Sequence, residues 1–135
     1  MTGYRLNPIG WVRSPLKDIA DAPHQGRPAG VEAEILMEEK VLQGLHGIRA
    51  GDKLFVMCWF HMADRETLRV HPRGDSAIPK RGVFATRSPD RPNPIGLSLV
   101  DVLAVEGPIL KVRGLDAVDG TPVVDLKPYV RCLDH

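Results

Sequence analysis

The sequence has little cysteine and no long apolar run. Its 135 residues include two cysteines, Cys58 and Cys132, which argues against a disulfide framework and against a cysteine-based zinc site. Cys58 lies in the apolar run LFVMCWF, where a thiol is more often buried filler than a ligand or nucleophile. No stretch approaches the about 20 apolar residues of a membrane-spanning helix, and the N-terminal MTGYRLNPIG has no signal-peptide core. The default expectation is a cytoplasmic protein with no membrane association.

Several signatures of common enzyme classes are also missing. No GxGxxG follows a first strand, and strands do not alternate with helices, which argues against a parallel α/β dinucleotide-binding fold. Ser88 and Ser98 do not lie in a GxSxG turn, so a serine hydrolase is not expected. His61, Asp64 and His71 are close in sequence, but their spacing matches no strong metal-binding pattern. We therefore expect no metal.

The net charge is close to neutral, but the basic residues are unevenly placed. A formal charge of +1 is a weak signature for a nucleic-acid-binding protein. Between residues 69 and 91, however, six basic residues occur with two aspartates, Asp75 and Asp90; the basic residues are Arg69, Arg73, Lys80, Arg81, Arg87 and Arg91. A local basic surface is one interpretation, and a set of separate solvated charges is the other.

Short apolar segments recur along the chain and are separated by glycine- and proline-containing turns. They predict strands at residues 4–13, 31–37, 53–62, 67–71, 95–105, 109–113 and 123–126. Apolar residues at helical spacing predict one short helix within 38–48, and 16–30 is a long loop of the kind that is functional or disordered. Within 95–105 we expect Leu97, Leu99 and Val102 to face inward. This pattern is typical of an all-β barrel or sandwich.

The segment at residues 82–98 reads GVFATRSPDRPNPIGLS and is organised by three prolines. Pro89, Pro92 and Pro94 fix their own φ angles and disfavour helix in the residues before them. The segment is therefore predicted to be a loop held in shape, and such loops often display binding chemistry. The alternative is a stiff connection between strands that carries solvated charges.

This segment, together with LDAVDGTPVVDLKPY at 115–129 and IGWVRSP at 9–15, closely resembles the TrmO family, also called TsaA-like. Members of that family are S-adenosylmethionine-dependent methyltransferases that act on N6 of threonylcarbamoyladenosine beside the tRNA anticodon. They have a small β-barrel instead of a Rossmann domain. The resemblance covers nearly the whole chain. It implies a mainly β protein, with one small antiparallel β-barrel domain over residues 1–135, one short helix and long functional loops, and without the extra C-terminal domain of some bacterial members.

The resemblance also implies a set of cofactor contacts. They fall on Pro23, His24, Gln25, His61, Met62, Arg87, Leu97, Arg113, Gly114, Leu115 and Asp116. S-adenosylmethionine needs a cation, acceptors and an apolar slot, and the slot could come from Trp59, Phe60, Met62 and Leu97. Arg87 suits a fixed anionic or adenine-edge contact, because a guanidinium offers a planar pair of donors.

Substrate contacts are expected at Lys80, Arg91 and Asn93. For Lys80 and Arg91 the reason is that a cation can hold a substrate carboxylate or a tRNA phosphate. No catalytic residue is assigned. His24 and His61 are candidates for a base or hydrogen-bond partner, although a lone histidine at a strand end is more often structural.

Two functions remain open at this point. The first is a tRNA N6-methyltransferase, or a relative that methylates another substrate, and the second is a module that binds S-adenosylmethionine without turnover. A homodimer is expected in either case. So small a barrel has little interior volume, so a large cofactor must lie in a surface cleft that a second subunit can deepen.

Overall fold

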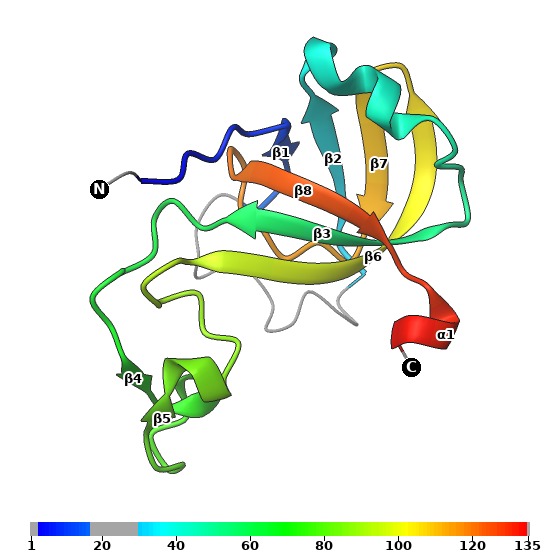
Figure 1. Ribbon diagram of the computed structural model, residues 1–135. Coiled ribbons are helices and arrows are strands. Elements are labelled where there is room, and N and C mark those ends of the chain that lie inside the picture. The colour runs from blue at the N-terminus through cyan, green and yellow to red at the C-terminus, as the bar shows by residue number, and fades with distance from the viewer. Residues whose placement is uncertain (1–2, 17–29, 135) are drawn as a thin grey trace.

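The computed structural model describes residues 3–16 and 30–134. Six strands close an antiparallel barrel in the order β1-β2-β7-β6-β3-β8 (Figure 1). Their bounds are Gly10–Arg13 (β1), Glu32–Met37 (β2), Lys53–Trp59 (β3), Ile95–Glu106 (β6), Ile109–Arg113 (β7) and Pro122–Pro128 (β8). The predicted mainly β fold with a small antiparallel barrel is confirmed.

The long connection between β3 and β6 holds a second, two-stranded ribbon. Its strands are β4 (Arg69–Val70) and β5 (Arg81–Gly82), which pair antiparallel. In Figure 1 this ribbon lies away from the barrel at the lower left. The strand predicted at 67–71 is thus present but only two residues long, and it pairs outside the barrel sheet.

The predicted short helix is confirmed and is a 3₁₀ helix, η2 (Glu39–Leu45). It lies over one end of the barrel (Figure 1) and buries Leu45. Among the described residues, three single-turn helices were not predicted, since so short an element leaves no periodic signal. They are η3 (Pro72–Gly74), η4 (Val83–Ala85) and α1 (Arg131–Asp134).

Alternating apolar side chains fill the barrel. On β2 the buried residues are Ala33, Ile35 and Met37, as the period-two pattern predicts. On β3 they are Leu54, Val56 and Cys58, so Cys58 is core filler, as expected. Because aliphatic side chains fill the interior, the functional site must lie on the outside of the barrel or at its edge.

The prediction for β6 was wrong at two positions. The buried residues are Gly96, Ser98, Val100 and Val102, whereas Leu97 is 48% exposed and both Leu97 and Leu99 point outward. Pairing of Cys58 with Gly96 and of Leu54 with Val100 places the even-numbered β6 residues on the core face. The sequence was misleading because small residues occupy this part of the core face while leucines occupy the outer face.

β6 is longer than β7, so one edge of the first half of β6 extends beyond its pairing with β7. β7 pairs with β6 only from Asp101 to Glu106, with a register shift between Val102 and Ala104. Residues 95–100 of β6 therefore pair with β3 on one side, and among the described residues no barrel strand pairs with them on the other. The segment after β7 runs along this edge, where the Asp116 side chain meets Ser98. No helix in the described ranges is long and apolar enough to cross a membrane.

Candidate functional site

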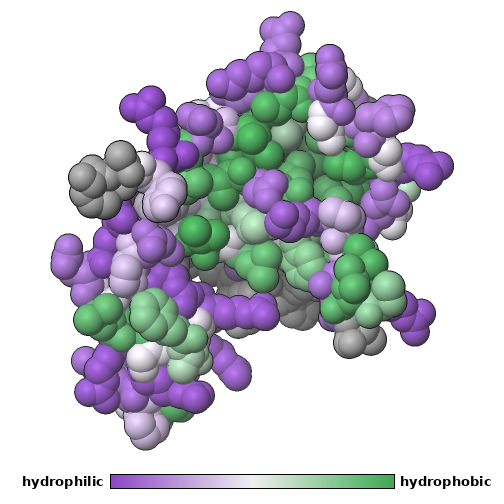
Figure 2. Space-filling model, viewed as in Figure 1, coloured by the Kyte–Doolittle hydropathy of each residue, from purple (hydrophilic) through white to green (hydrophobic). Residues whose placement is uncertain are grey.

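A cleft of about 780 Å³ lies at this edge, within the roughly 300–1,000 Å³ of typical small-molecule sites. One wall comes from the first half of β6 and the residues after β3. The other comes from η3, β5 and the loop after η4, and Asp116, Val118 and Thr121 complete the lining. Figure 2 shows the segment that carries the ribbon as a lobe at the lower left, separated from the barrel by a hollow.

The apolar wall depends on a close approach between Phe60 and β6. A Cβ atom added at Gly96 would lie 2.2 Å from the Phe60 ring, so only glycine lets this ring pack against the strand. Phe60, Met62 and Leu97 all line the cleft, as the predicted apolar slot requires. Trp59 does not line it; its indole instead stacks with the Arg65 guanidinium at 5.1 Å from the ring centroid.

A partly buried carboxylate provides the main polar feature of the cleft. Ser98 Oγ donates a hydrogen bond of 2.9 Å to Asp116 Oδ1. Burial raises the pKa of Asp116 above its ordinary value, while the Ser98 hydrogen bond opposes that rise. Burial, with a smaller effect from the Asp116 charge, raises the pKa of the neighbouring Cys58 to about 12. The cleft thus offers a carboxylate to a cationic or hydrogen-bond-donating ligand, and Cys58 remains a neutral thiol.

The loop from Val83 to Arg91 is held in shape by the Arg91 guanidinium. Its Nη2 donates to the Val83 carbonyl (2.6 Å) and its Nη1 to the Ser88 carbonyl (3.1 Å). Both nitrogens also reach the Thr86 carbonyl at 3.3 Å. Arg91 lines the cleft, but much of its donor capacity stabilises the backbone that presents Arg87 to the cleft.

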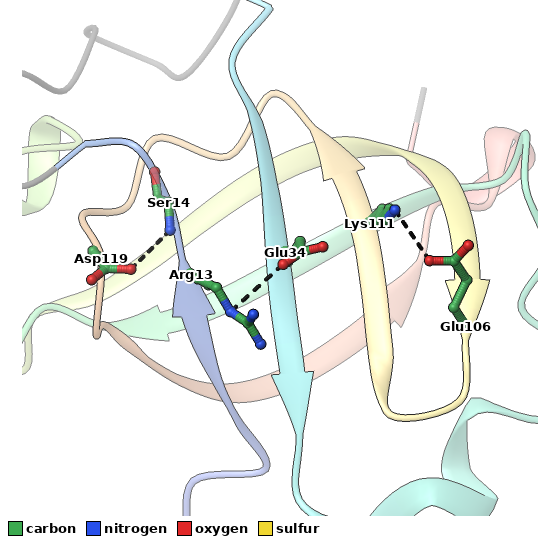
Figure 3. Close-up of polar contacts among 6 residues, drawn as sticks. All are labelled: Arg13, Ser14, Glu34, Glu106, Lys111 and Asp119. Carbon is green, nitrogen blue, oxygen red and sulfur yellow. Dashed lines mark hydrogen bonds and ion pairs between the residues drawn. The ribbon is translucent and has the colours of Figure 1, made fainter.

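Three further arginines line the cleft: Arg73, Arg81 and Arg87. All three are exposed, and within the described residues none has an ion-pair partner; the ion pairs found there lie on barrel strands. Figure 3 shows two of these pairs, Arg13 with Glu34 at 3.6 Å and Lys111 with Glu106 at 3.1 Å. The cleft arginines are therefore available to a ligand.

Asp119 has a structural role in the turn before β8. Its Oδ1 accepts a 3.0 Å hydrogen bond from the Ser14 backbone N–H (Figure 3), and its own N–H bonds to the Leu16 carbonyl at 2.7 Å. Gly120, with φ of +86°, completes the turn. These bonds tie the turn to the end of β1 and so fix one border of the cleft.

The structure brings part of the predicted site together. His61, Met62, Arg87, Leu97, Asp116 and Arg91 all line the cleft. Pro23, His24 and Gln25 lie outside the described residues. Their contacts, like every residue assignment to cofactor or substrate, stay predictions.

The remaining predicted residues lie near the cleft without lining it. Arg113 pairs with Glu32 at 3.3 Å, and Gly114 and Leu115 are buried in the segment that leads to Asp116. Asn93 Oδ1 accepts a 3.4 Å hydrogen bond from Arg65, and Lys80 is exposed beside β5. These positions are suited to supporting the walls or to contacting a ligand that extends beyond the cleft.

Sequence reasoning missed Ser98 as a site residue, because it considered Ser98 only as a hydrolase nucleophile. The missing signal was a polar residue on the core face of a strand, which needs the correct β6 register to be recognised. It also missed His71, whose Nδ1 donates to the Ile78 carbonyl at 2.8 Å and which lines the cleft. In the ranges that the structure covers, no cluster of histidine, cysteine or acidic residues could hold a metal.

Some known proteins with similar sequences are about as long as this chain, and others are longer. A Methanothermobacter thermautotrophicus protein named a probable S-adenosyl-L-methionine-binding protein is 51% identical over 96% of this chain and 93% of its own length. The Escherichia coli tRNA (adenine(37)-N6)-methyltransferase is 38% identical over 96% of this chain. The chain spans 59% of that enzyme.

Structure and family comparisons lead to the same group. The crystal structure of TrmO from Pseudomonas aeruginosa superposes with a TM-score of 0.81 at 31% identity, over 98% of this chain and 59% of that one. The family model of the tRNA-methyltransferase O N-terminal domain matches residues 11–135. The chain therefore belongs to the TrmO family, and its barrel corresponds to the N-terminal domain of that family.

Proposed function

We propose that this protein is an S-adenosylmethionine-dependent methyltransferase that methylates N6 of a modified adenosine beside the tRNA anticodon. The observation that carries the proposal is the cleft of about 780 Å³, which combines a carboxylate, arginines and an apolar wall. The E. coli relative is named a tRNA (adenine(37)-N6)-methyltransferase, and several relatives are named for binding S-adenosyl-L-methionine.

The chemistry of the cleft fits the cofactor. S-adenosylmethionine carries a sulfonium and an ammonium, which suit the Asp116 carboxylate, and a carboxylate, which suits the Arg87 guanidinium. Its adenine suits the apolar wall of Phe60, Met62 and Leu97. His61, at the end of this wall, stays a predicted cofactor contact.

The edge of β6 that does not pair with β7 adds backbone groups that suit an adenine edge. The Phe60 N–H bonds to the Pro94 carbonyl, and the Val102 N–H bonds to the Asp52 carbonyl, each at 2.8 Å. In an antiparallel pair the bonded residues alternate, so the N–H and C=O of Leu97 point away from β3. They point to the edge where β7 has not yet begun to pair. We assign Leu97 to the cofactor through these backbone groups.

Catalysis by this site depends mainly on positioning the nucleophile against the methyl group of the cofactor. The bound cofactor supplies an electrophilic methyl group on a sulfonium, so an in-line approach of the nucleophile gives much of the rate. Arg91 holds the loop that presents Arg87, and Gly96 allows Phe60 to close the apolar wall. The carbamoylated N6 is a poor nucleophile because its lone pair is delocalised. A hydrogen-bond acceptor near N6, from the protein or from the threonyl carboxylate of the substrate, completes the proposal.

Substrate contacts are proposed around the mouth of the cleft. Lys80 and Asn93 lie outside the cleft lining, where a ligand larger than the cofactor would reach them. Arg91 contributes chiefly through the loop that it holds.

The second candidate is a module that binds S-adenosylmethionine without turnover. It is favoured by the names of the archaeal relatives, which state binding alone. Purified protein, labelled cofactor and bulk tRNA from cells lacking the gene separate the two functions. The methyltransferase transfers label to tRNA, whereas the binding module retains the cofactor and leaves the tRNA unlabelled.

We further propose a cytoplasmic homodimer. Large apolar side chains are exposed on the β3–β6 connection and near the C-terminus, including Leu68 (60%), Phe84 (80%) and Leu133 (78%), and exposed apolar groups of this size often mark a contact surface. Light scattering at micromolar concentration should report twice the chain mass. A monomer with full methyl-transfer activity would contradict the dimer.

A further inference from the structure

The β4–β5 ribbon presents its two strand arginines to opposite sides. Arg69 pairs with Gly82, and Val70 pairs with Arg81. Directly paired residues share a face of a ribbon, and neighbours along a strand point to opposite faces. Val70 and Arg81 both line the cleft, whereas Arg69 and Gly82 do not. The ribbon therefore directs Arg81 toward the cleft and Arg69 away from it.

A second arginine near the ribbon has an unusual backbone. Arg73 in η3 has φ of 53° and ψ of 24°, and it is the one non-glycine residue with positive φ among the residues described. This left-handed conformation is free for glycine but strained for arginine. Such strain occurs preferentially at functional sites, and Arg73 does line the cleft.

The cleft with its cofactor bound has an excess of positive charge. Arg73, Arg81 and Arg87 line the cleft with Asp116 as its single carboxylate among the described residues. The cofactor brings one carboxylate against an ammonium and a sulfonium, so it adds positive charge. When the cofactor pairs with Arg87 and Asp116, Arg73 and Arg81 still line the cleft, and no carboxylate of the described residues neutralises them.

We propose that Arg73 and Arg81 form a phosphate-docking surface for an RNA strand that enters the cleft beside the ribbon. A free nucleoside has no phosphate and supplies at most one carboxylate, whereas an RNA strand places a phosphate on each side of the target base. Arg69, one residue along the same hairpin but on the other face, lies outside this surface. The inference rests on the proposed function and names the residues through which its substrate binds.

The test is the salt dependence of RNA binding. Affinity for a synthetic anticodon stem–loop RNA is measured by fluorescence anisotropy over a KCl series, with the cofactor product S-adenosylhomocysteine present. Arg81→Gln and Arg73→Gly are each compared with the control Arg69→Gln. Arg73→Gly keeps the left-handed backbone accessible, so its effect on binding reports the lost charge rather than misfolding.

Each cleft variant should make the slope of log affinity against log salt shallower by about 0.7 unit, the value for one phosphate contact to a single strand, and weaken binding about fivefold near 0.1 M salt. The Arg69→Gln control should keep the wild-type slope. Equal slopes in all four proteins, or an equal loss in the Arg69 control, would overturn the docking surface while leaving the methyltransferase proposal intact. A wild-type protein that binds S-adenosylhomocysteine but no RNA would contradict both. Loss of RNA binding accompanied by loss of dimer mass would show that the two arginines serve a protein interface instead.

Discussion

At the scale of single residues, we expect Asp116 to make cofactor binding depend on pH. Its carboxylate is partly buried, and burial raises its pKa above the ordinary value. A protonated Asp116 is neutral and loses its attraction for the positive groups of the cofactor. We predict that cofactor affinity falls as pH is lowered through this raised pKa.

Calorimetric titrations with S-adenosylmethionine over a pH series check this prediction. Asp116→Asn should abolish the fall of cofactor affinity at low pH. It should also weaken binding at neutral pH by roughly 1.5–3 kcal/mol, the range for a hydrogen bond to a charged group. Glu39→Gln on η2, outside the cleft lining, changes charge equally and should retain the wild-type pH profile. If cofactor affinity still falls at low pH in Asp116→Asn, a group other than Asp116 causes the fall.

The same residue should reduce the stability of the protein without ligand. Because the folded-state pKa of Asp116 is raised, the folded state holds its proton to higher pH than the unfolded state does. The free energy of unfolding therefore falls as pH rises from the ordinary pKa of an aspartate through the raised one. Asp116→Asn should unfold at a higher temperature than wild type at neutral pH, where wild type keeps a buried charge. A lower melting temperature would show that Asp116 stabilises the fold.

The two cysteines should differ in reactivity. The Cys58 thiol is buried with a pKa of about 12, whereas Cys132 is exposed. The thiolate is the reactive form, so a thiol reagent at neutral pH should modify Cys132 alone in native protein. Both should react after denaturation. Mass spectrometry of the labelled peptides checks this, and rapid native labelling of Cys58 would contradict its burial.

At the scale of elements, the contact between Phe60 and β6 shapes the cleft. A Cβ added at Gly96 would meet the far end of the Phe60 ring at 2.2 Å, so Gly96→Ala forces the ring to turn away. The ring is a flexible side chain, so we expect a modest loss of stability, about 1–3 kcal/mol, but a larger effect on cofactor affinity. Gly44→Ala in η2, where a Cβ meets nothing within 4 Å, is the matched control. Unchanged cofactor affinity in Gly96→Ala would exclude Phe60 from the binding wall.

The sequence predicted which residues face the core where the two faces of a strand differ from each other in polarity. On β2, Glu32 and Glu34 alternate with Ala33 and Ile35, and the facing was correct. On β6 the inward residues Gly96 and Ser98 are smaller and more polar than the outward Leu97. The bounds of the strand were therefore predictable. Which of its residues face the core was determined by pairing with β3 and could not be read from hydrophobicity.

At the scale of the whole molecule, the strand order of the barrel cannot be read from local patterns. β2 pairs with β7 and β8 pairs with β1, and both pairings join segments far apart in the sequence. Resemblance to a known family therefore supplied the barrel in advance, together with candidate site residues, of which His61, Met62, Arg87, Leu97, Asp116 and Arg91 line the cleft. The division of the basic segment between a cleft face with Arg81 and an outer face with Arg69 needed the pairing of β4 with β5.

The central claim is that the cleft binds S-adenosylmethionine in order to methylate tRNA. Wild type, Arg87→Ala and the control Arg69→Ala are each incubated with methyl-labelled cofactor and bulk tRNA from cells lacking the gene, and the tRNA is then digested to nucleosides. We predict label on N6 of a modified adenosine with wild type and the control. With Arg87→Ala we predict a large loss, matching cofactor binding weakened by roughly 1.5–3 kcal/mol. Cofactor that binds to wild type while no label enters any nucleoside would contradict the account.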